Sequence, residues 1–361
     1  MPATRIDVHT ASSAYPIVIG AGVLEALAPL LDEHSFSRRR FVVSSATVWK
    51  LHGVAVSRAL PGADPILIQD GERAKHTGTV MRIYDALVKA GADRGAGLIG
   101  VGGGVVGDVA GFAAATYLRG IQVAHVPTTL LAQVDSAVGG KVGVNHPLGK
   151  NLIGAFHQPR LVAVDPLLLA TLPRREFRAG LYEVVKYGMA FEPSLFERTR
   201  GSLRAIAARD PATLTPIIAE SCRIKAGVVM QDERERGPRR LLNFGHTAGH
   251  ALEAVTRYRR FRHGEAIAWG MLAAADLSVA RGVLPESARQ ALAGLITALG
   301  PLPAVADLKV ADVLEAIRRD KKVVDGRLHF VTITEIGRSQ IVDDVTEAEL
   351  RGALTRIGLS G

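Results

Sequence analysis

Short apolar runs rich in Val and Ile alternate with helix-like stretches through the first 165 residues, and this alternation most limits the folds open to the chain. Gly, Pro or Asp lies at the ends of most of these runs. Strands that are covered by crossover helices on both faces have this continuous apolar character. The pattern therefore predicts an α/β fold built on a parallel sheet. The expected strands are 16–20, 40–45, 65–69, 97–102, 122–127 and 161–165.

After residue 165 the pattern changes to the helical period. Prolines punctuate it at positions 173, 193, 211, 238, 285 and 301, so we expect a mostly α-helical second half. Only 328–334 and 339–342 resemble strands there, and we expect them to pair as a hairpin around Gly337. A domain typically holds about 100 to 200 residues. The chain of 361 residues therefore divides into two expected domains, 1–165 and 166–361, with a cleft between them.

The chain carries an excess of positive charge, with 44 Lys and Arg against 35 Asp and Glu, which gives a net charge of +9. Such a field attracts nucleic acid, anionic membranes and small anionic molecules alike, so the distribution of the charges must discriminate among them. The sequence has no run of five or more basic residues, and the densest clusters are 38–40 and the arginines of 257–262. We therefore expect no nucleic-acid partner and favour an anionic small molecule.

The single cysteine, Cys222, excludes an intrachain disulfide and a thiolate metal cluster. The N-terminal MPATRIDVHT lacks the apolar core of a secretion signal, so we expect a cytoplasmic location. The longest apolar stretch, 266–280, is interrupted by Asp276 and is shorter than the ~20 residues that cross a bilayer. We expect this stretch to form a buried helix in a protein without a membrane partner.

A glycine-rich turn follows the expected strand 97–102. Residues 102–107, GGGVVG, fit the pattern G-x-G-x-x-G and lead into the helix-like DVAGFAAATYL. Glycines allow a tight turn, and the N–H groups of a helix N-terminus bind a pyrophosphate, so this context indicates a dinucleotide site. The acidic residue usually found about 20 positions downstream is missing, and the candidates are Asp70 and Glu72 after the strand 65–69. We therefore expect a strand order other than the standard one, while a turn that only packs a helix on a strand is the alternative.

Two histidines in GHTAGH, His246 and His250, are four residues apart and would share one helix face, and His263 follows 13 residues after His250. Thr247 replaces the glutamate of the H-E-x-x-H motif, so the pattern is not that of a metalloprotease. Two imidazoles and one carboxylate would leave positions open on a catalytic Zn²⁺. The spacing leaves the carboxylate open among Glu183, Glu253 and Glu265. The alternative is that these histidines are solvated or only hydrogen-bond within the helix.

Lysines also stand among glycines and small apolar residues in 127–156, where ammonium groups are well placed to neutralise phosphate or carboxylate oxygens. Glu183 and Lys186 in LYEVVKYG are three residues apart, which by itself indicates an ion pair of a few tenths of a kcal/mol on a helix surface. Lys225 and Arg239 would by themselves be interpreted as residues of solvated faces.

Taken together and in this order, five segments resemble the 3-dehydroquinate synthase family. They are GGGVVGDVAGFAAATYLRG, VPTTLLAQVDSAVGGKVGVNHPLGKNLIGAFHQP, LYEVVKYG, LLNFGHTAGHALE and HGEAIAWGM. The likeness runs from about Asp70 to Lys322. It implies an N-terminal Rossmann-like, NAD-binding domain and a mostly α-helical C-terminal domain that binds the metal and the substrate. It also implies NAD⁺ and a divalent metal as cofactors, and a homodimer.

The resemblance also implies the roles of individual residues. The metal, Zn²⁺ first and Co²⁺ as the alternative, would be held by Glu183, His246 and His263. The residues expected to bind NAD⁺ are Asp70, Gly71, Glu72, Lys75, Gly103, Gly104, Val105, Val106, Gly107, Asp108, Thr128, Thr129, Lys141, Lys150 and Thr171.

The residues expected around the substrate fall into three groups. Lys141, Asn151 and Lys321 would bind the phosphate, with Lys322 as the alternative to Lys321, and Arg119 would reach in from a partner subunit. Lys225 and Arg239 would bind the carboxylate. Asp135, Lys186 and Asn243 would line the hydroxyl side of the substrate, and His250 would lie near the substrate instead of on the metal.

The implied activity is that of a lyase of the shikimate pathway, which leads to the aromatic amino acids. It converts 3-deoxy-D-arabino-heptulosonate 7-phosphate into 3-dehydroquinate and phosphate by transient oxidation, phosphate elimination, reduction, ring opening and aldol closure. A polyol dehydrogenase of the same fold would release NADH and would not need the phosphate-binding lysines. A related sugar phosphate cyclase would differ in its substrate pocket, and a nucleic-acid-binding protein would leave the metal and glycine motifs without a role.

Overall fold

The computed structural model describes residues 3–63, 65–319, 323–324 and 327–361. The chain forms two compact units. The first comprises Met1–Pro173 and Arg209–Arg234, and the second comprises Arg174–Ala208 and Glu235–Gly361. The assignment of residues 1–165 and 166–361 to two functional domains stays a prediction.

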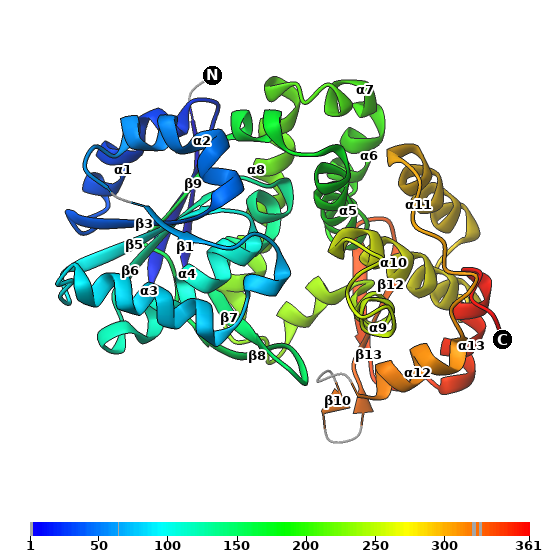
Figure 1. The fold of residues 1–361 in the computed structure, drawn as a ribbon. Helices are drawn as coiled ribbons and strands as arrows, with labels where there is room; N and C mark the ends of the chain where they lie inside the picture. Colours follow the sequence, from blue (N-terminus) through cyan, green and yellow to red (C-terminus); the bar gives the residue numbers. More distant parts are fainter. Residues whose placement is uncertain (1–2, 64, 320–322, 325–326) are drawn as a thin grey trace. The chain divides into compact units, whose positions relative to one another are not determined.

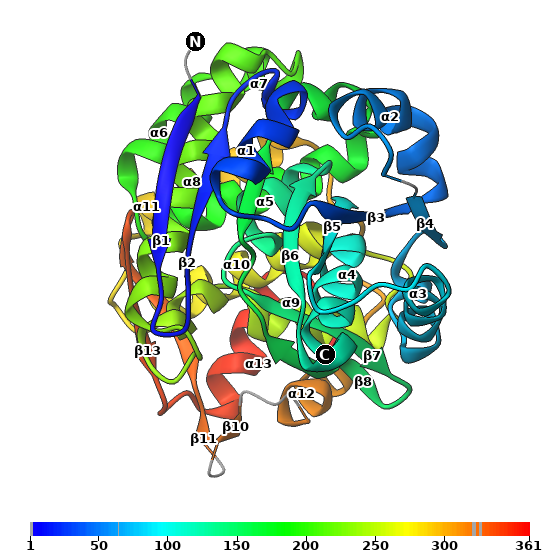
Figure 2. The same cartoon turned by 90° about the vertical axis from the view of Figure 1, so that its left-hand side faces the viewer.

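A seven-stranded sheet forms the centre of the first unit, with the order β1-β2-β9-β6-β5-β3-β4. Figure 1 labels five strands of this sheet, and Figure 2 shows the antiparallel pair of β1 and β2 at one edge. The other neighbouring strands pair in parallel. The strands are β1 (Thr4–His9), β2 (Ala14–Ile19), β3 (Arg39–Ser45), β4 (Pro65–Ile68), β5 (Ala96–Gly102), β6 (Gln122–Pro127) and β9 (Leu161–Val164).

This sheet confirms the expected parallel strands and the expectation of a non-standard order. The order differs from the 3-2-1-4-5-6 arrangement because β1 and β2, the first strands of the chain, lie beyond β9, and only β4 lies beyond β3. β1, an edge strand, is not among the strands expected from the sequence. Its side chains alternate between buried and exposed instead of forming a continuous apolar run.

Helices cover both faces of the sheet in the first unit. Successive side chains of a strand point to opposite faces, so Val42 joins one apolar cluster with α1 and α2, and Val43 joins another with α3 and α4. The helices are α1 (Leu27–Glu33), α2 (Ala46–Ala59), α3 (Thr77–Lys89), α4 (Gly104–Thr116) and α8 (Pro211–Gln231). The hairpin of β7 (Lys141–His146) and β8 (Gly149–Phe156) pairs antiparallel outside this sheet. Short turns are η1 (Val23–Ala26), η2 (Glu72–Ala74), η3 (Tyr117–Arg119), η4 (Ala132–Ser136) and η5 (Pro166–Thr171).

The second unit is mostly helical, as expected. The stretch 266–280 lies in a largely buried helix, α10, and the hairpin around Gly337 is present as β12 and β13. In the described part of the chain, none of the helices has the length and apolar character needed to span a membrane. The helices are α5 (Arg174–Ala190), α6 (Pro193–Gly201), α7 (Leu203–Ala207), α9 (His246–Val255), α10 (His263–Ala280), α11 (Glu286–Leu299), α12 (Val310–Arg318) and α13 (Glu347–Arg356), with the turn η6 (Pro238–Asn243). The strands are β10 (Val323–Val324), β11 (Arg327–Leu328), β12 (Phe330–Glu335) and β13 (Arg338–Val342).

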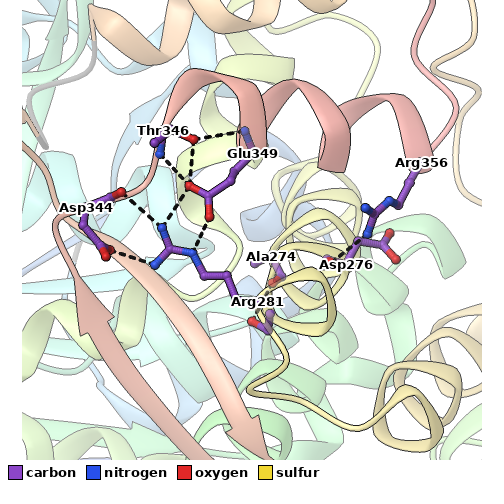
Figure 3. Close-up of polar contacts among 8 residues, drawn as sticks. Ala274, Asp276, Arg281, Asp344, Thr346, Glu349 and Arg356 are labelled. Carbon is purple, nitrogen blue, oxygen red and sulfur yellow. Dashed lines mark hydrogen bonds and ion pairs between the residues drawn. The ribbon is translucent and has the colours of Figure 1, made fainter.

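An arginine at the end of α10 attaches the last helix, α13, to the rest of the second unit (Figure 3). Arg281 donates two hydrogen bonds to Glu349, at 2.6 and 2.9 Å, and one to Asp344 at 2.7 Å. The hydrogen bonds from Arg281 and from Thr346 hold the pKa of Glu349 at about 2. Since paired, partly buried charges of this kind fix orientation, they hold α13 against the helix that begins with His263.

A buried histidine in the sheet predicts how stability depends on pH. Burial lowers the pKa of His125, on β6, to about 4, and nearby His157 adds to this effect. A histidine of the unfolded chain titrates near 6.5, so between these values the unfolded chain binds a proton that the folded chain does not, and stability falls as the pH falls. When the pH falls from 7.5 to 5, we expect the titration of His125 to lower the parent's free energy of unfolding by about 2 kcal/mol. His125→Gln cannot bind this proton, so its free energy of unfolding should fall by about 2 kcal/mol less over the same range.

Urea unfolding at the two pH values measures this difference. His9→Gln, at an exposed position of β1, is the control and should follow the parent. An unchanged pH dependence in His125→Gln would contradict the account.

Candidate functional site

The glycine-rich turn joins β5 to α4 at the carboxyl edge of the sheet. A Cβ on Gly102 would lie 2.5 Å from Val106 Cγ2, and a Cβ on Gly103 would lie 2.9 Å from Thr129 Cγ2. Both positions require glycine because the turn packs directly on its neighbours. The backbone N–H groups at the start of α4 are then accessible to a phosphate at close range. The turn therefore has the strand before it and the helix after it that a dinucleotide site needs.

Other residues predicted to bind the cofactor follow neighbouring strands of the same sheet. Asp70 follows β4 and accepts a hydrogen bond from Thr47 Oγ1 at 2.9 Å. Thr128 follows β6 directly. Thr171 ends η5, the turn after β9, and its Oγ1 lies 2.9 Å from His52 Nε2. Because parallel strands end at one edge of a sheet, the first unit brings these residues to the edge where α/β proteins bind ligands.

A buried lysine connects the sheet edge with the β7–β8 hairpin. Lys75 is 5% exposed, and its Nζ lies 2.5 Å from Asp108 Oδ2 and donates to Asn151 Oδ1 at 2.5 Å. Asn145 Nδ2 donates to Glu72 Oε1 at 2.8 Å. Burial raises the pKa of Asp108, although the ammonium of Lys75 opposes this effect. The network fixes the hairpin that carries the predicted phosphate-binding residues.

Substrate residues predicted for the first unit lie on this hairpin, on α8 and on short turns. Lys225, buried on α8, donates from Nζ to the carbonyl oxygen and to Oδ1 of Asp135, both at 2.7 Å. Lys141 begins β7, and Lys150 lies near the start of β8. Arg119 is exposed at the end of η3 and has a left-handed backbone with φ of 69°. The structure thus pairs Lys225 with Asp135.

Glu183, His246 and His263 meet in the second unit, from three different helices. Glu183 lies in the middle of α5, and each of the two histidines is the first residue of its helix, α9 or α10. Glu183 Oε1 lies 3.8 Å from His246 Nε2 and 3.5 Å from His263 Nε2. Donors that bind one tetrahedral zinc ion at about 2.0–2.2 Å lie about 3.4 Å apart. The three side chains therefore fit a divalent cation.

The two oxygens of Glu183 have different partners, and the carboxylates nearby change the pKa of His263. Lys186 Nζ lies 2.5 Å from Glu183 Oε2, and both side chains are buried, so Oε1 is the oxygen that faces the imidazoles. Burial lowers the pKa of His263, but the carboxylates of Glu253 and Glu183 outweigh it and raise this pKa to about 10. Since an imidazolium cannot bind a metal, a cation and a proton compete for His263.

The structure also separates the three carboxylates that the spacing left open. Glu265 accepts hydrogen bonds from Arg175 Nε and Nη2, both at 2.7 Å. It also accepts from the N–H of Arg262 and so caps the N-terminus of α10. Glu253 Oε2 lies 3.3 Å from Nδ1 of His263, the nitrogen that does not face Glu183. Glu183 is therefore the carboxylate placed between the two Nε2 atoms.

Glycines allow the three helices to approach closely enough to form the cluster. A Cβ on Gly264 would lie 1.9 Å from Ala179 O of α5, and a Cβ on Gly270 would lie 1.9 Å from Gly245 O. A Cβ on Gly249 would lie 2.9 Å from a backbone oxygen of α10. Real Cβ atoms do not approach oxygen this closely, so larger residues would push α10 away from α5 and α9.

Of the other predicted site residues in the second unit, His250 lies beside the cluster, and Arg239 and Asn243 lie on a short turn. The ring centroid of His250 lies 5.2 Å from that of His246, and ligand atoms of His246, His250 and His263 lie within 4.8 Å of one another. Arg239 is 1% exposed and lies with Asn243 on η6. Lys321 and Lys322 lie outside the described residues.

Two contacts that support the cluster are not expected from the sequence motifs. The contact of Glu253 with His263 follows from the helix register, since Glu253 lies three residues after His250 and seven after His246. A carboxylate on the histidine face of a helix is the signal that could have identified this contact. The pair of Arg175 with Glu265 joins residues 90 positions apart, and no motif marked it.

Comparisons with known proteins extend over almost the whole chain. Residues 65–179 match the family model described as 3-dehydroquinate synthase N-terminal, and residues 180–323 match the model described as 3-dehydroquinate synthase C-terminal. The 3-dehydroquinate synthase of Gloeobacter violaceus is 46% identical over 355 residues, which are 97% of this chain and 98% of that protein.

Two solved structures are also similar. A 2-epi-5-epi-valiolone synthase from Streptomyces hygroscopicus, with NAD⁺ and Zn²⁺ bound, is 29% identical with a TM-score of 0.88, covering 98% of this chain and 99% of that one. A 2-deoxy-scyllo-inosose synthase in complex with carbaglucose-6-phosphate, NAD⁺ and Co²⁺ is 27% identical with a TM-score of 0.88 and the same coverage.

The close helix packing generates a prediction about metal binding. Gly264→Ala must move α10 away from Ala179, so we expect it to lower the free energy of unfolding by about 1–3 kcal/mol and Zn²⁺ affinity at least tenfold. Gly294→Ala is the matched control, since its Cβ would meet no atom of the described residues within 4 Å on helix α11. It should stabilise the protein by about 0.5–1 kcal/mol and leave Zn²⁺ affinity unchanged. Thermal unfolding and chelator competition measure both quantities, and equal Zn²⁺ affinity in the two variants would refute the packing argument.

Proposed function

Because the chain belongs to the 3-dehydroquinate synthase family, we propose that it converts 3-deoxy-D-arabino-heptulosonate 7-phosphate into 3-dehydroquinate and inorganic phosphate. The observation that carries this proposal is the Glu183, His246 and His263 cluster, whose donor atoms lie 3.5 and 3.8 Å apart. One cation bound by all three side chains would require donor atoms at about this spacing. The enzyme is a lyase, because phosphate leaves by elimination and the reaction has no net oxidation.

NAD⁺ and a divalent cation are the cofactors of this reaction. The two similar solved structures have NAD⁺ together with Zn²⁺ or Co²⁺. Glu183, His246 and His263 would hold the cation, and the glycine-rich turn with Asp70 and its neighbours would hold NAD⁺. When bound, the cation polarises substrate hydroxyl oxygens, and NAD⁺ accepts a hydride that is returned in the same turnover.

The chain's own residues bind and orient a substrate that has an anion at each end. Lys141 and Asn151, on the β7–β8 hairpin, would hold the phosphate, and Lys225 and Arg239 would hold the carboxylate. Lys225 already donates to two oxygens at 2.7 Å, so its ammonium is held in place before substrate binds. Together these residues would hold the substrate while phosphate is eliminated.

His250 and Lys186 have different roles beside the cluster. The ring of His250 lies beside those of both histidines proposed as ligands, with centroid distances of 5.2 and 5.8 Å. In this proposal, His250 would exchange a proton with a substrate hydroxyl. Lys186 holds Glu183 through Oε2, so that Oε1 is directed at the imidazoles.

Three further parts of this proposal concern the whole molecule. The enzyme acts as a homodimer in which Arg119 of the partner subunit reaches the phosphate site. Residues 1–165 serve mainly NAD⁺, and residues 166–361 serve the metal and the substrate. The protein works in the cytoplasm.

Related sugar phosphate cyclases are the nearest alternative. The identity of 46% to a 3-dehydroquinate synthase exceeds the 29% and 27% to the valiolone and inosose synthases, so it favours the heptulosonate substrate. A polyol dehydrogenase would use the cation and NAD⁺ but would have no role for a phosphate site.

Cofactor consumption separates these functions. With the heptulosonate phosphate and NAD⁺ at one hundredth of its concentration, we expect complete release of phosphate and no lasting NADH absorbance, because oxidation and reduction occur in one site. One NADH formed per product would indicate a dehydrogenase. Phosphate release from a heptulose 7-phosphate without the carboxylate, and not from the heptulosonate, would indicate another cyclase.

Metal content tests the ligand assignment. His246→Ala and His263→Ala each remove one donor, so after dialysis we expect much less zinc per chain than in the parent, measured by mass spectrometry. His250→Ala is the control, which should keep its zinc and lose activity. Chelation should abolish the parent's activity, and Zn²⁺ or Co²⁺ should restore it. Unaltered zinc in both ligand variants would show that the assignment is wrong.

A further inference from the structure

The carboxylate of Glu253 lies on the outer side of His263. Glu253 Oε2 is 3.3 Å from His263 Nδ1, while Nε2 of the same ring is 3.5 Å from Glu183 Oε1. The imidazole therefore stands between two carboxylates, one at each nitrogen. Glu253 is 4% exposed, so solvent screens this contact only weakly.

The position of Glu253 decides which nitrogen of His263 is available as a donor. A neutral imidazole carries its proton on one nitrogen and a lone pair on the other. With the carboxylate of Glu253 at Nδ1, the proton is on Nδ1, which donates it in a hydrogen bond to Glu253. The lone pair is then on Nε2, which faces Glu183.

His246 is oriented in the same way by a different acceptor. Its Nδ1 lies 3.1 Å from the backbone oxygen of Phe244, and its Nε2 faces Glu183. The two imidazoles thus present the same nitrogen to the cluster. The two rings differ at Nδ1, where His246 contacts a neutral backbone carbonyl and His263 contacts the negatively charged carboxylate of Glu253.

Helix α9 and the turn after it hold Glu253 in place. The N–H of Tyr258 donates to the backbone oxygen of Glu253 at 2.7 Å, and Arg257 and Tyr258 both have left-handed backbones with φ of 52° and 56°. Non-glycine residues adopt this conformation only where surrounding contacts enforce it. The turn that leads from α9 to His263 is therefore built directly on Glu253.

We propose that Glu253 is a positioning residue of the metal centre, which directs Nε2 of His263 at the cation and strengthens it as a donor. The inference rests on the metal site of the proposed function. Carboxylates or carbonyls behind metal-binding histidines fix the ring and raise its basicity, and their loss typically lowers metal affinity 10–100-fold. Glu253 would act through His263 and would not touch the substrate.

Two substitutions separate the hydrogen bond from the charge. Glu253→Gln keeps an oxygen that accepts from Nδ1 but removes the charge, and Glu253→Ala removes both. We expect zinc affinity, measured by chelator competition, to fall about 10–100-fold in Glu253→Ala and less in Glu253→Gln. The visible spectrum of the Co²⁺ form should change in Glu253→Ala, and Glu253→Gln should restore much of it.

Asp276→Asn is the matched control. Asp276 is a buried carboxylate of the same helix as His263, 6% exposed, and it accepts from Arg289 at 2.9 and 3.2 Å. This substitution should lower the melting temperature of the metal-free protein and leave zinc affinity unchanged. A purely structural role of Glu253 would give the same result as this control.

The outcomes distinguish the inference from the function on which it rests. Parental zinc affinity in both Glu253 variants, with His263→Ala depleted of zinc, would overturn the role of Glu253 and leave the metal site intact. Parental zinc affinity in His263→Ala as well would overturn the proposed metal site itself. If Glu253→Ala does not fold, the affinity of Glu253→Gln decides: a drop supports the proposal, and the parental value contradicts it.

Discussion

The carboxylate of Glu183 is the constraint on which the second unit depends. It is fully buried, and an isolated buried charge is costly enough that it must be paired or bind a cation. Lys186 satisfies one oxygen from the next turn of α5, and two imidazoles face the other. Those imidazoles come from the first residues of α9 and α10, so both helices must begin beside α5, and glycines at the crossings make this approach possible.

The first unit has a different requirement, which is that backbone groups stay accessible at the end of a packed sheet. The glycine-rich turn does this after β5, because its glycines lie against Val106 and Thr129 without side chains between. Lys75 then joins Asp108 of the following helix to Asn151 of the β7–β8 hairpin. A single buried ammonium therefore links the predicted cofactor edge to the predicted phosphate-binding hairpin.

Local patterns were enough to predict the parallel strands, the glycine turn in its context and the buried helix α10, because each depends on neighbouring residues. The β7–β8 hairpin was not predicted, since its glycines interrupt the apolar pattern and Gly143 faces Ile153 O closely across the pair. Spacing could not choose among Glu183, Glu253 and Glu265, because the choice depends on how α5 meets two helices far along the chain. Taken alone, Arg239 was interpreted as solvated, yet it is 1% exposed, because charge says little about burial when the partners are distant in sequence.

The central claim is that Glu183, His246 and His263 form one cation site around a single carboxylate oxygen. An anomalous difference map from crystals of the Zn²⁺-loaded protein, recorded at the zinc absorption edge, tests it most directly. We expect one peak at about 2.0–2.2 Å from Glu183 Oε1 and from Nε2 of His246 and His263. A zinc ion held by His246, His250 and His263, with Glu183 bound only to Lys186, would contradict the claim.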